Sequence, residues 1–133
     1  MKSGAHHGFT LIEVLLVFVL LALVTALVVP LGVAQVEKAR AQAEWLEFAR
    51  LVDRIGMDAF LRSETVSIDA AGTELRWRGE AEAGSRRTFD YLFFEPAQQV
   101  RINPNGIADR EEIVALVRDQ RRTLSLLPEG AEY

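Results

Sequence analysis

The feature that most constrains this chain is an uncharged, apolar segment that runs from Val14 to Ala34. As an α-helix rising about 1.5 Å per residue, it would be roughly 32 Å long. That length matches the hydrocarbon core of a bilayer, which is about 30 Å thick. Packing inside a water-soluble domain is the weaker alternative, because buried helices of that kind are rarely uncharged over such a length. The segment therefore predicts a membrane-spanning helix.

A cleaved secretion signal is the main competing interpretation of the same segment. Lys2 would be its basic region, and Gly32-Val33-Ala34 loosely resembles a small-residue cleavage site. However, the apolar region of a secretion signal is about 7–15 residues long, which is shorter than the run found here. The run is also preceded directly by Glu13, an acid for which a secretion signal has no use. We therefore favour a helix that stays in the membrane.

The charges that flank the segment predict its orientation. Lys2 and the amino terminus precede it, whereas Glu37 partly offsets Lys38 and Arg40 on the other side. Positive charge in short flanking segments favours the cytoplasmic side of the membrane. We therefore expect a single-pass inner-membrane protein with a cytoplasmic N-terminus and a periplasmic C-terminal domain.

The composition of the rest of the chain argues against several classes of function. The net charge is −4 with interleaved signs, so no nucleic-acid partner is expected. Cysteine is absent, and the two histidines are His6 and His7, close to the N-terminus. The usual zinc, Cys–His and Ser–His sites therefore lack their residues, and no phosphate-binding glycine loop is present. We expect no enzymatic activity, no metal and no cofactor.

The most informative motif stands at the entrance to the apolar segment and reads Gly8-Phe9-Thr10-Leu11-Ile12-Glu13. A carboxylate costs about 2.5–3.5 kcal/mol at the centre of a bilayer and less near its edge, so Glu13 needs a partner. The motif resembles the type IV prepilin signature, in which a short leader ends in Gly and the mature chain starts with Phe. An interfacial acid without any partner is the weaker alternative.

The resemblance implies both a processing step and an assembly contact. Prepilin peptidase would cut between Gly8 and Phe9 and methylate the new amine of Phe9. In a filament, Glu13 would neutralise that amine on a neighbouring pilin or pseudopilin, setting the register between subunits rather than adding much stability. Inner-membrane lipid before assembly and an inner-membrane assembly platform are the other expected partners. Pro30 and Gly32 predict a bend of the helix, although an irregularity near the membrane exit would explain them equally well.

Beyond the membrane segment we expect the helix to continue to about Arg62. Its apolar residues recur at steps of three and four, which predicts one core-facing stripe: Trp45, Phe48, Ala49, Val52, Ile55, Ala59 and Phe60. Apolar and polar residues alternate at 66–68 and at 75–77, which predicts two strands of a hairpin that turns at 69–72. Residues 79–87 are polar and predict a flexible connection.

Further strands are expected nearer the C-terminus. Phe89, Tyr91 and Phe93 alternate and predict a strand that stops near Pro96. A short strand at 99–102 precedes a strong turn signal at 103–106. Segments 112–117 and 123–127 predict a last hairpin around 118–121, with a helix over 109–118 as the alternative.

The predicted fold is therefore α+β, with a long N-terminal helix packed on a small antiparallel sheet, as in pilins. We divide the chain into a leader (1–8), a transmembrane and assembly helix (9–36), an amphipathic stem helix (37–62) and a periplasmic β-rich domain (63–133). The segments 60–62, 93–96 and 102–106 resemble those of H-type minor pseudopilins of type II secretion and FimT-like minor pilins. This implies a structural subunit that starts or caps a periplasmic filament. The alternative is a bitopic receptor or enzyme with an uncleaved anchor.

Overall fold

The computed structural model describes residues 8–81 and 83–127. It contains one helix, α1 (Leu11–Arg62), and six strands. The strands are β1 (Val66–Gly72), β2 (Glu74–Arg78), β3 (Ser85–Thr88), β4 (Leu92–Ile102), β5 (Glu112–Val117) and β6 (Gln120–Ser125). The chain divides into two compact units, an N-terminal unit (Met1–Lys38) and a C-terminal unit (Ala39–Tyr133), which are described separately.

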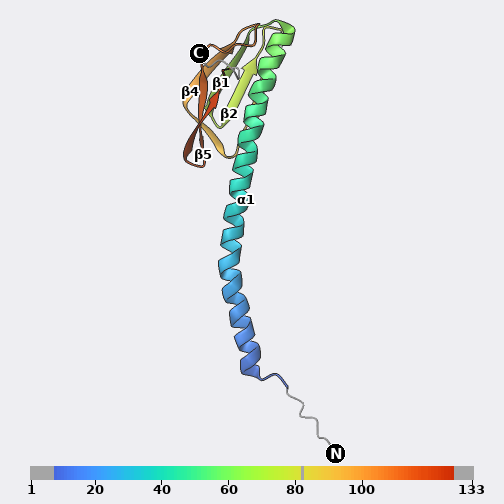
Figure 1. Ribbon diagram of the computed structural model, residues 1–133, viewed down its shortest axis with the longest axis vertical. Coiled ribbons are helices and arrows are strands. Elements are labelled where there is room, and N and C mark those ends of the chain that lie inside the picture. The colour runs from blue at the N-terminus through green and yellow to red at the C-terminus, as the bar shows by residue number, and fades with distance from the viewer. Residues whose placement is uncertain (1–7, 82, 128–133) are drawn as a thin grey trace, which may run out of the picture. The chain divides into compact units, whose positions relative to one another are not determined.

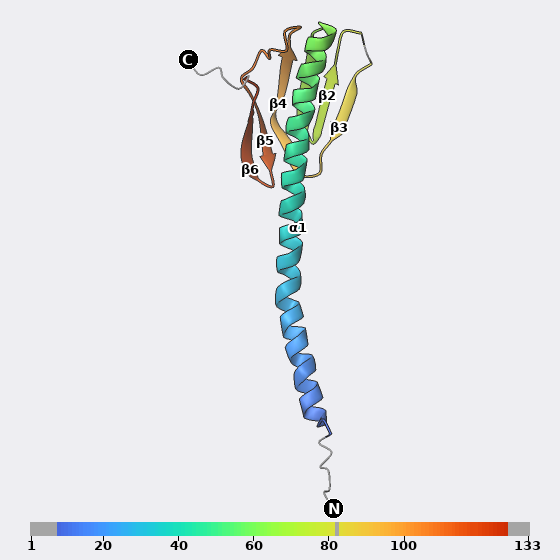
Figure 2. The ribbon, with the colours of Figure 1, turned by 45° about the vertical axis from the view of Figure 1, so that its right-hand side comes forward.

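The C-terminal unit is a single sheet with the last part of α1 packed on one of its faces (Figures 1 and 2). The strand order is β3-β2-β1-β4-β5-β6, and every neighbouring pair is antiparallel. The expected α+β fold, with a long N-terminal helix on a small antiparallel sheet, is confirmed. The expected continuation of the helix to Arg62 is confirmed as well.

The core lies between α1 and the sheet and contains a cluster of three aromatic rings. Phe48 of α1 lies 5.9 Å from Phe89 and 5.3 Å from Phe94, measured between ring centroids, and all three side chains are buried. Tilted and edge-on contacts of this kind add to the free energy gained by burying the rings. The predicted core-facing stripe of the helix is buried at Phe48 and at Val52, Ile55 and Ala59. It is wrong at Phe60, which is 56% exposed.

The first hairpin forms as expected, but its turn comes later than predicted. Residues 69–71 continue β1 and pair with β2, and the chain reverses at Gly72 and Thr73. Gly72 has a φ of 57°, in the left-handed region where glycine avoids the usual steric cost. Part of the connection expected to be flexible over 79–87 is instead a strand, because β3 pairs with β2 along the edge of the sheet.

Strand β4 differs most from the expectation. It is one strand of 11 residues rather than two short ones, and it continues through Pro96. Its pairing with β1 is irregular there, since Ala70 opposes Gln98 and Gly72 opposes Phe94. A proline is tolerated at such a bulge because no regular ladder bond is lost. The expected alternation is also out of phase, because Phe94 is buried and Phe93 is 43% exposed.

The last hairpin is confirmed, with a tighter turn than expected. β5 and β6 are joined by Arg118 and Asp119, whose φ angles are 48° and 65°. Two successive residues with positive φ are typical of a type I′ hairpin turn, whose twist matches that of the strands. Gln120 and Arg121 therefore belong to β6, and the alternative helix over 109–118 is wrong.

A side chain completes the sheet where β4 and β5 separate. The backbones of these strands pair only at Leu92 with Val117 and at Phe93 with Leu116 among the described residues. Further along, the buried amide of Gln98 donates from Nε2 to the Val114 carbonyl oxygen at 2.7 Å. Its Oε1 accepts from the Val114 N–H at 2.9 Å. The Gln98 side chain thus makes the two hydrogen bonds to Val114 that the backbone of a paired strand would otherwise make.

Replacing Gln98 with Leu is expected to lower the free energy of unfolding by about 2–4 kcal/mol, because both backbone groups of Val114 lose their partner in a buried place. Urea denaturation of the two proteins measures the difference. Gln99→Leu is the matched control, since Gln99 is exposed and should change stability by less than about 0.5 kcal/mol. Equal midpoints for both variants would contradict this role of Gln98.

Glu44 holds the start of β4 against α1. Its two carboxylate oxygens accept hydrogen bonds from the backbone N–H groups of Asp90 (2.7 Å) and Tyr91 (2.6 Å). Bonds to an ionised acceptor are stronger than neutral ones. The contact fixes the bend that connects β3 to β4.

Glu44→Ala is therefore expected to lower the free energy of unfolding by about 1–3 kcal/mol. Glu47→Ala provides the comparison on the same helix, because the ion pair of Glu47 with Arg87 is half exposed and contributes at most about 1 kcal/mol. Thermal unfolding followed by circular dichroism ranks the variants. A larger loss in Glu47→Ala than in Glu44→Ala would overturn the assignment.

Candidate functional site: the start of the apolar helix

The predicted cleavage junction precedes the first turn of α1. Gly8, Phe9 and Thr10 are outside the helix and exposed, and the Phe9 side chain is 80% exposed. A Cβ atom added to Gly8 would meet nothing within 4 Å, and the φ of Gly8 is not in the left-handed region. The fold of the chain itself therefore gives no reason for glycine at this position.

Thr10 caps α1 and thereby places Glu13. The Thr10 carbonyl accepts from the N–H groups of Glu13 (3.1 Å) and Val14 (3.2 Å), and its Oγ1 lies 3.3 Å from the Glu13 nitrogen. The Thr10 hydroxyl is a side-chain N-cap, and it shares the Glu13 N–H with the Thr10 carbonyl at the open end of the helix. This role of Thr10 was missed from the sequence, although Thr followed three residues later by Glu is the capping-box signal.

Glu13 lies in the first turn of the helix with its carboxylate exposed. A negative charge is favourable there because the N-terminal end of a helix carries partial positive charge. Within the described ranges, the structure shows no side chain bonded to this carboxylate. The acid is thus held next to the apolar segment with its charge available to another molecule.

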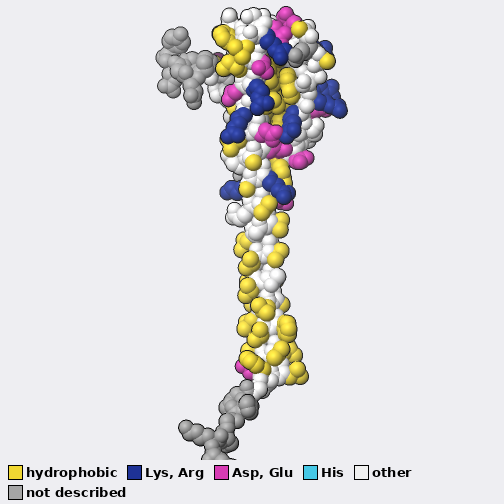
Figure 3. Space-filling model, turned by 90° about the vertical axis from the view of Figure 1, so that its right-hand side faces the viewer, with side chains coloured by type: hydrophobic (Ala, Val, Ile, Leu, Met, Phe, Trp, Pro, Cys, Tyr) yellow, Lys and Arg dark blue, Asp and Glu magenta, His cyan; other side chains and the backbone are white. Residues whose placement is uncertain are grey.

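The helix that follows presents apolar side chains on all sides within the N-terminal unit. From Val14 to Val36 its large hydrophobic side chains are between 40% and 67% exposed, and they occupy the visible face in Figure 3. The Thr25 hydroxyl donates to the Leu21 carbonyl at 2.7 Å, so it adds no unsatisfied polar group. The helix is long and apolar enough to cross a membrane. Its side chains need either lipid or other apolar helices around them.

Pro30 and Gly32 lie inside α1, and the helical assignment continues through both. Pro30 has no N–H to donate, so one bond of the helix is missing there. A Cβ at Gly32 would meet nothing within 4 Å. The predicted bend at these residues stays a prediction.

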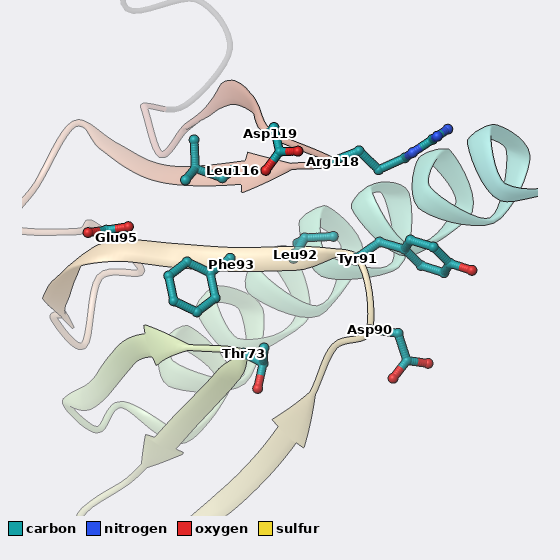
Figure 4. Close-up of a pocket in the computed structure, with 9 residues that line it drawn as sticks. All are labelled: Thr73, Asp90, Tyr91, Leu92, Phe93, Glu95, Leu116, Arg118 and Asp119. Atoms are coloured by element: carbon teal, nitrogen blue, oxygen red, sulfur yellow. The ribbon is translucent and has the colours of Figure 1, made fainter. Parts of the chain in front are cut away.

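A second place with the shape of a binding site is a hollow on the face of the sheet opposite to α1, shown in Figure 4 with the helix behind the strands. Phe93 and Leu116 line it, and Asp90, Glu95 and Asp119 contribute acidic groups around it. Among the residues that the structure describes, no group of three potential metal ligands occurs. His6 and His7 lie outside the described residues.

Comparison with known proteins bears on the first site. Residues 4–29 match the prokaryotic N-terminal methylation motif, the type IV pilin-like prepilin signal. No curated protein and no solved structure shows a significant match to the chain. The motif is typical of type IV pilin-like prepilins, and it implies processing by prepilin peptidase. Together with the apolar helix, it fits a membrane-anchored bitopic protein.

Proposed function

We propose that this chain is a structural minor pseudopilin or minor pilin, cut between Gly8 and Phe9, methylated at Phe9 and assembled into a periplasmic filament. The observation that carries the proposal is the coincidence of the methylation motif at residues 4–29 with a glycine that the fold does not require. Because the fold of the chain does not require glycine at position 8, we attribute this glycine to recognition by another molecule. A residue without a side chain lets a peptidase approach the backbone closely.

The assembly step follows from the chemistry of the two groups. Cleavage creates an ammonium group on Phe9 at the edge of the apolar segment, and Glu13 supplies a carboxylate four residues further on. Both charges are costly in an apolar environment unless they are paired. Pairing between neighbouring subunits removes this cost, while the apolar helices replace lipid contacts by contacts with one another. A neutralised pair also fixes the register in which two helices pack.

The place of this subunit in a filament is inferred from the outer part of the chain. Resemblance of segments 60–62, 93–96 and 102–106 to H-type pseudopilins and FimT-like pilins favours a minor subunit that starts or caps the filament. The partners would be prepilin peptidase, other pilins or pseudopilins and the inner-membrane assembly platform. The N-terminus would face the cytoplasm and the C-terminal unit the periplasm.

Chemical cross-linking in intact cells, with the peptidase gene present or deleted, tests the proposal. We expect the chain in the membrane fraction of both strains, and cross-linked products with other subunits only in the strain that has the peptidase. Identical cross-linking patterns in the two strains would favour the uncleaved receptor or enzyme instead.

A further inference from the structure

The face of the sheet opposite to α1 carries four arginines that come from the three strands β2, β3 and β4. Val66, Ile68 and Ala70 of β1 are buried toward the helix, so the alternate residues of β1 point to the other, outer face. Cross-strand partners share a face. The outer positions next to Ser67 are Arg78 on one side and Arg101 on the other.

The next outer row continues the pattern. Asp69 lies opposite Arg76, and Arg76 lies opposite Arg86 on the edge strand β3. We call the four residues Arg76, Arg78, Arg86 and Arg101 the arginine face. Like charges directly opposite each other destabilise a sheet. The pairing of Arg76 with Arg86 therefore lowers the stability of the fold and contributes nothing to it.

The acids on this face neutralise only part of its charge. Glu74 takes a two-point bond from Arg76, with Nε at 2.6 Å from Oε1 and Nη2 at 3.3 Å from Oε2. The hydrogen bond from Arg76 lowers the pKa of Glu74, which is therefore fully ionised and engaged at neutral pH. Within residues 8–81 and 83–127, the guanidinium groups of Arg78, Arg86 and Arg101 have no hydrogen bond or ion pair in the structure, and all three residues are exposed.

We propose that the arginine face binds an acidic segment of another protein, and, given the proposed function, of a neighbouring subunit or a cargo protein. Arg78 and Arg101 are two strand spacings apart, about 10 Å. On a partner segment in the polyproline II conformation, which has three residues per turn and rises about 3.1 Å per residue, carboxylates three residues apart lie on the same side about 9 Å apart and match that distance. Each guanidinium can bind a carboxylate through two parallel hydrogen bonds.

A protein segment fits this face better than a nucleic acid. Asp69 and Glu74 lie among the arginines and would repel a continuous row of phosphates, whereas a protein segment can place a donor beside them. The chain also has a net charge of −4, which weakens the long-range attraction of a polyanion. The acidic partner is thus expected to carry mixed polar side chains around its carboxylates.

Fluorescence anisotropy with the full chain in a non-ionic detergent tests this inference. The probe is a fluorescein-labelled synthetic peptide with Glu at every third position and Ser between. We expect saturable binding that weakens with added salt. The double variant Arg78→Glu/Arg101→Glu should bind the peptide at least about tenfold more weakly, which corresponds to a loss of about 1.4 kcal/mol of binding free energy. The control Arg50→Glu/Arg54→Glu, on exposed positions of α1, should keep the wild-type affinity within about threefold.

Three results would overturn the inference: no binding of the peptide by the wild type, an unchanged affinity in the Arg78/Arg101 variant, or tighter binding of a single-stranded oligonucleotide of equal charge. The melting temperature of both double variants should stay within about 4 °C of the wild type, which separates lost recognition from lost folding. The peptide measurement does not depend on processing, so a chain that keeps its leader would refute the proposed function and leave this inference standing.

Discussion

Replacing Gly8 with Val is expected to slow removal of the leader by about tenfold to a hundredfold, so that the chain accumulates as the full-length precursor. If the peptidase packs closely against the backbone at Gly8, a branched side chain there would clash with the enzyme. Such a clash destabilises the complex of enzyme and substrate by about 1–3 kcal/mol. The fold of the chain should not change, because a Cβ at Gly8 would meet nothing within 4 Å. Pulse labelling followed by gel electrophoresis gives the rate of conversion.

Gly32→Val is the matched control for Gly8→Val. Gly32 also has nothing within 4 Å of an added Cβ, but it lies in the apolar helix, away from the junction. We expect normal conversion in this variant. Normal conversion of Gly8→Val as well would show that glycine at this position is not read by the peptidase.

Replacing Glu13 with Ala is expected to abolish assembly while membrane insertion stays intact. Removing one partner of a buried ion pair leaves the Phe9 ammonium of the neighbour without a counter-charge, at a cost of about 3–5 kcal/mol. That cost weakens each contact between neighbours by more than about a hundredfold. Insertion should become no worse, because a carboxylate is removed from the edge of the apolar segment.

Membrane fractionation and cross-linking to partner subunits measure the two effects of Glu13→Ala separately. Glu13→Gln should behave like Glu13→Ala, since it keeps the size and loses the charge. Thr25→Ala is the control inside the same segment, because its hydroxyl bonds only to the Leu21 carbonyl of its own helix. Wild-type cross-linking in Glu13→Gln would remove the electrostatic role assigned to Glu13.

The long helix and the methylation motif could be recognised from the sequence because their signals are local. An uncharged run of this length and the order Gly8, Phe9, Glu13 depend on neighbouring residues alone. The core-facing stripe could be predicted for the same reason, except at Phe60. The sequence period places Phe60 on the same face as Val52 and Ala59, but the helix is near its end there and the sheet leaves Phe60 exposed.

The phase of β4 could not be predicted because distant residues set it. Glu44, on α1, binds the N–H groups of Asp90 and Tyr91 and holds a bend between Phe89 and the strand. The alternation of Phe89, Tyr91 and Phe93 therefore does not continue on one face, and Leu92 and Phe94 are buried instead. The residues 89–94 alone therefore do not show which side chains of β4 face the core, because the contact that decides it comes from Glu44 on α1.

Strand β3 and the arginine face were missed for a related reason. All four residues of β3 are exposed, so no alternation of apolar and polar residues marks the strand. In the sequence, the adjacent arginines at 86–87 and 121–122 could bind an acidic partner, but the mixed charge around them favours solvated turns. The strand order brings together Arg76, Arg86 and Arg101, and that order depends on pairing between distant segments.

Assembly through Phe9 and Glu13 requires a new amine on Phe9 in the working protein. Intact-mass spectrometry of protein isolated from native membranes, with and without prepilin peptidase, detects that amine. We expect a chain that begins at methylated Phe9 when the peptidase is present and one that keeps residues 1–8 when it is absent. A chain that keeps residues 1–8 in both strains and still forms its native assemblies would show that processing is not needed for assembly.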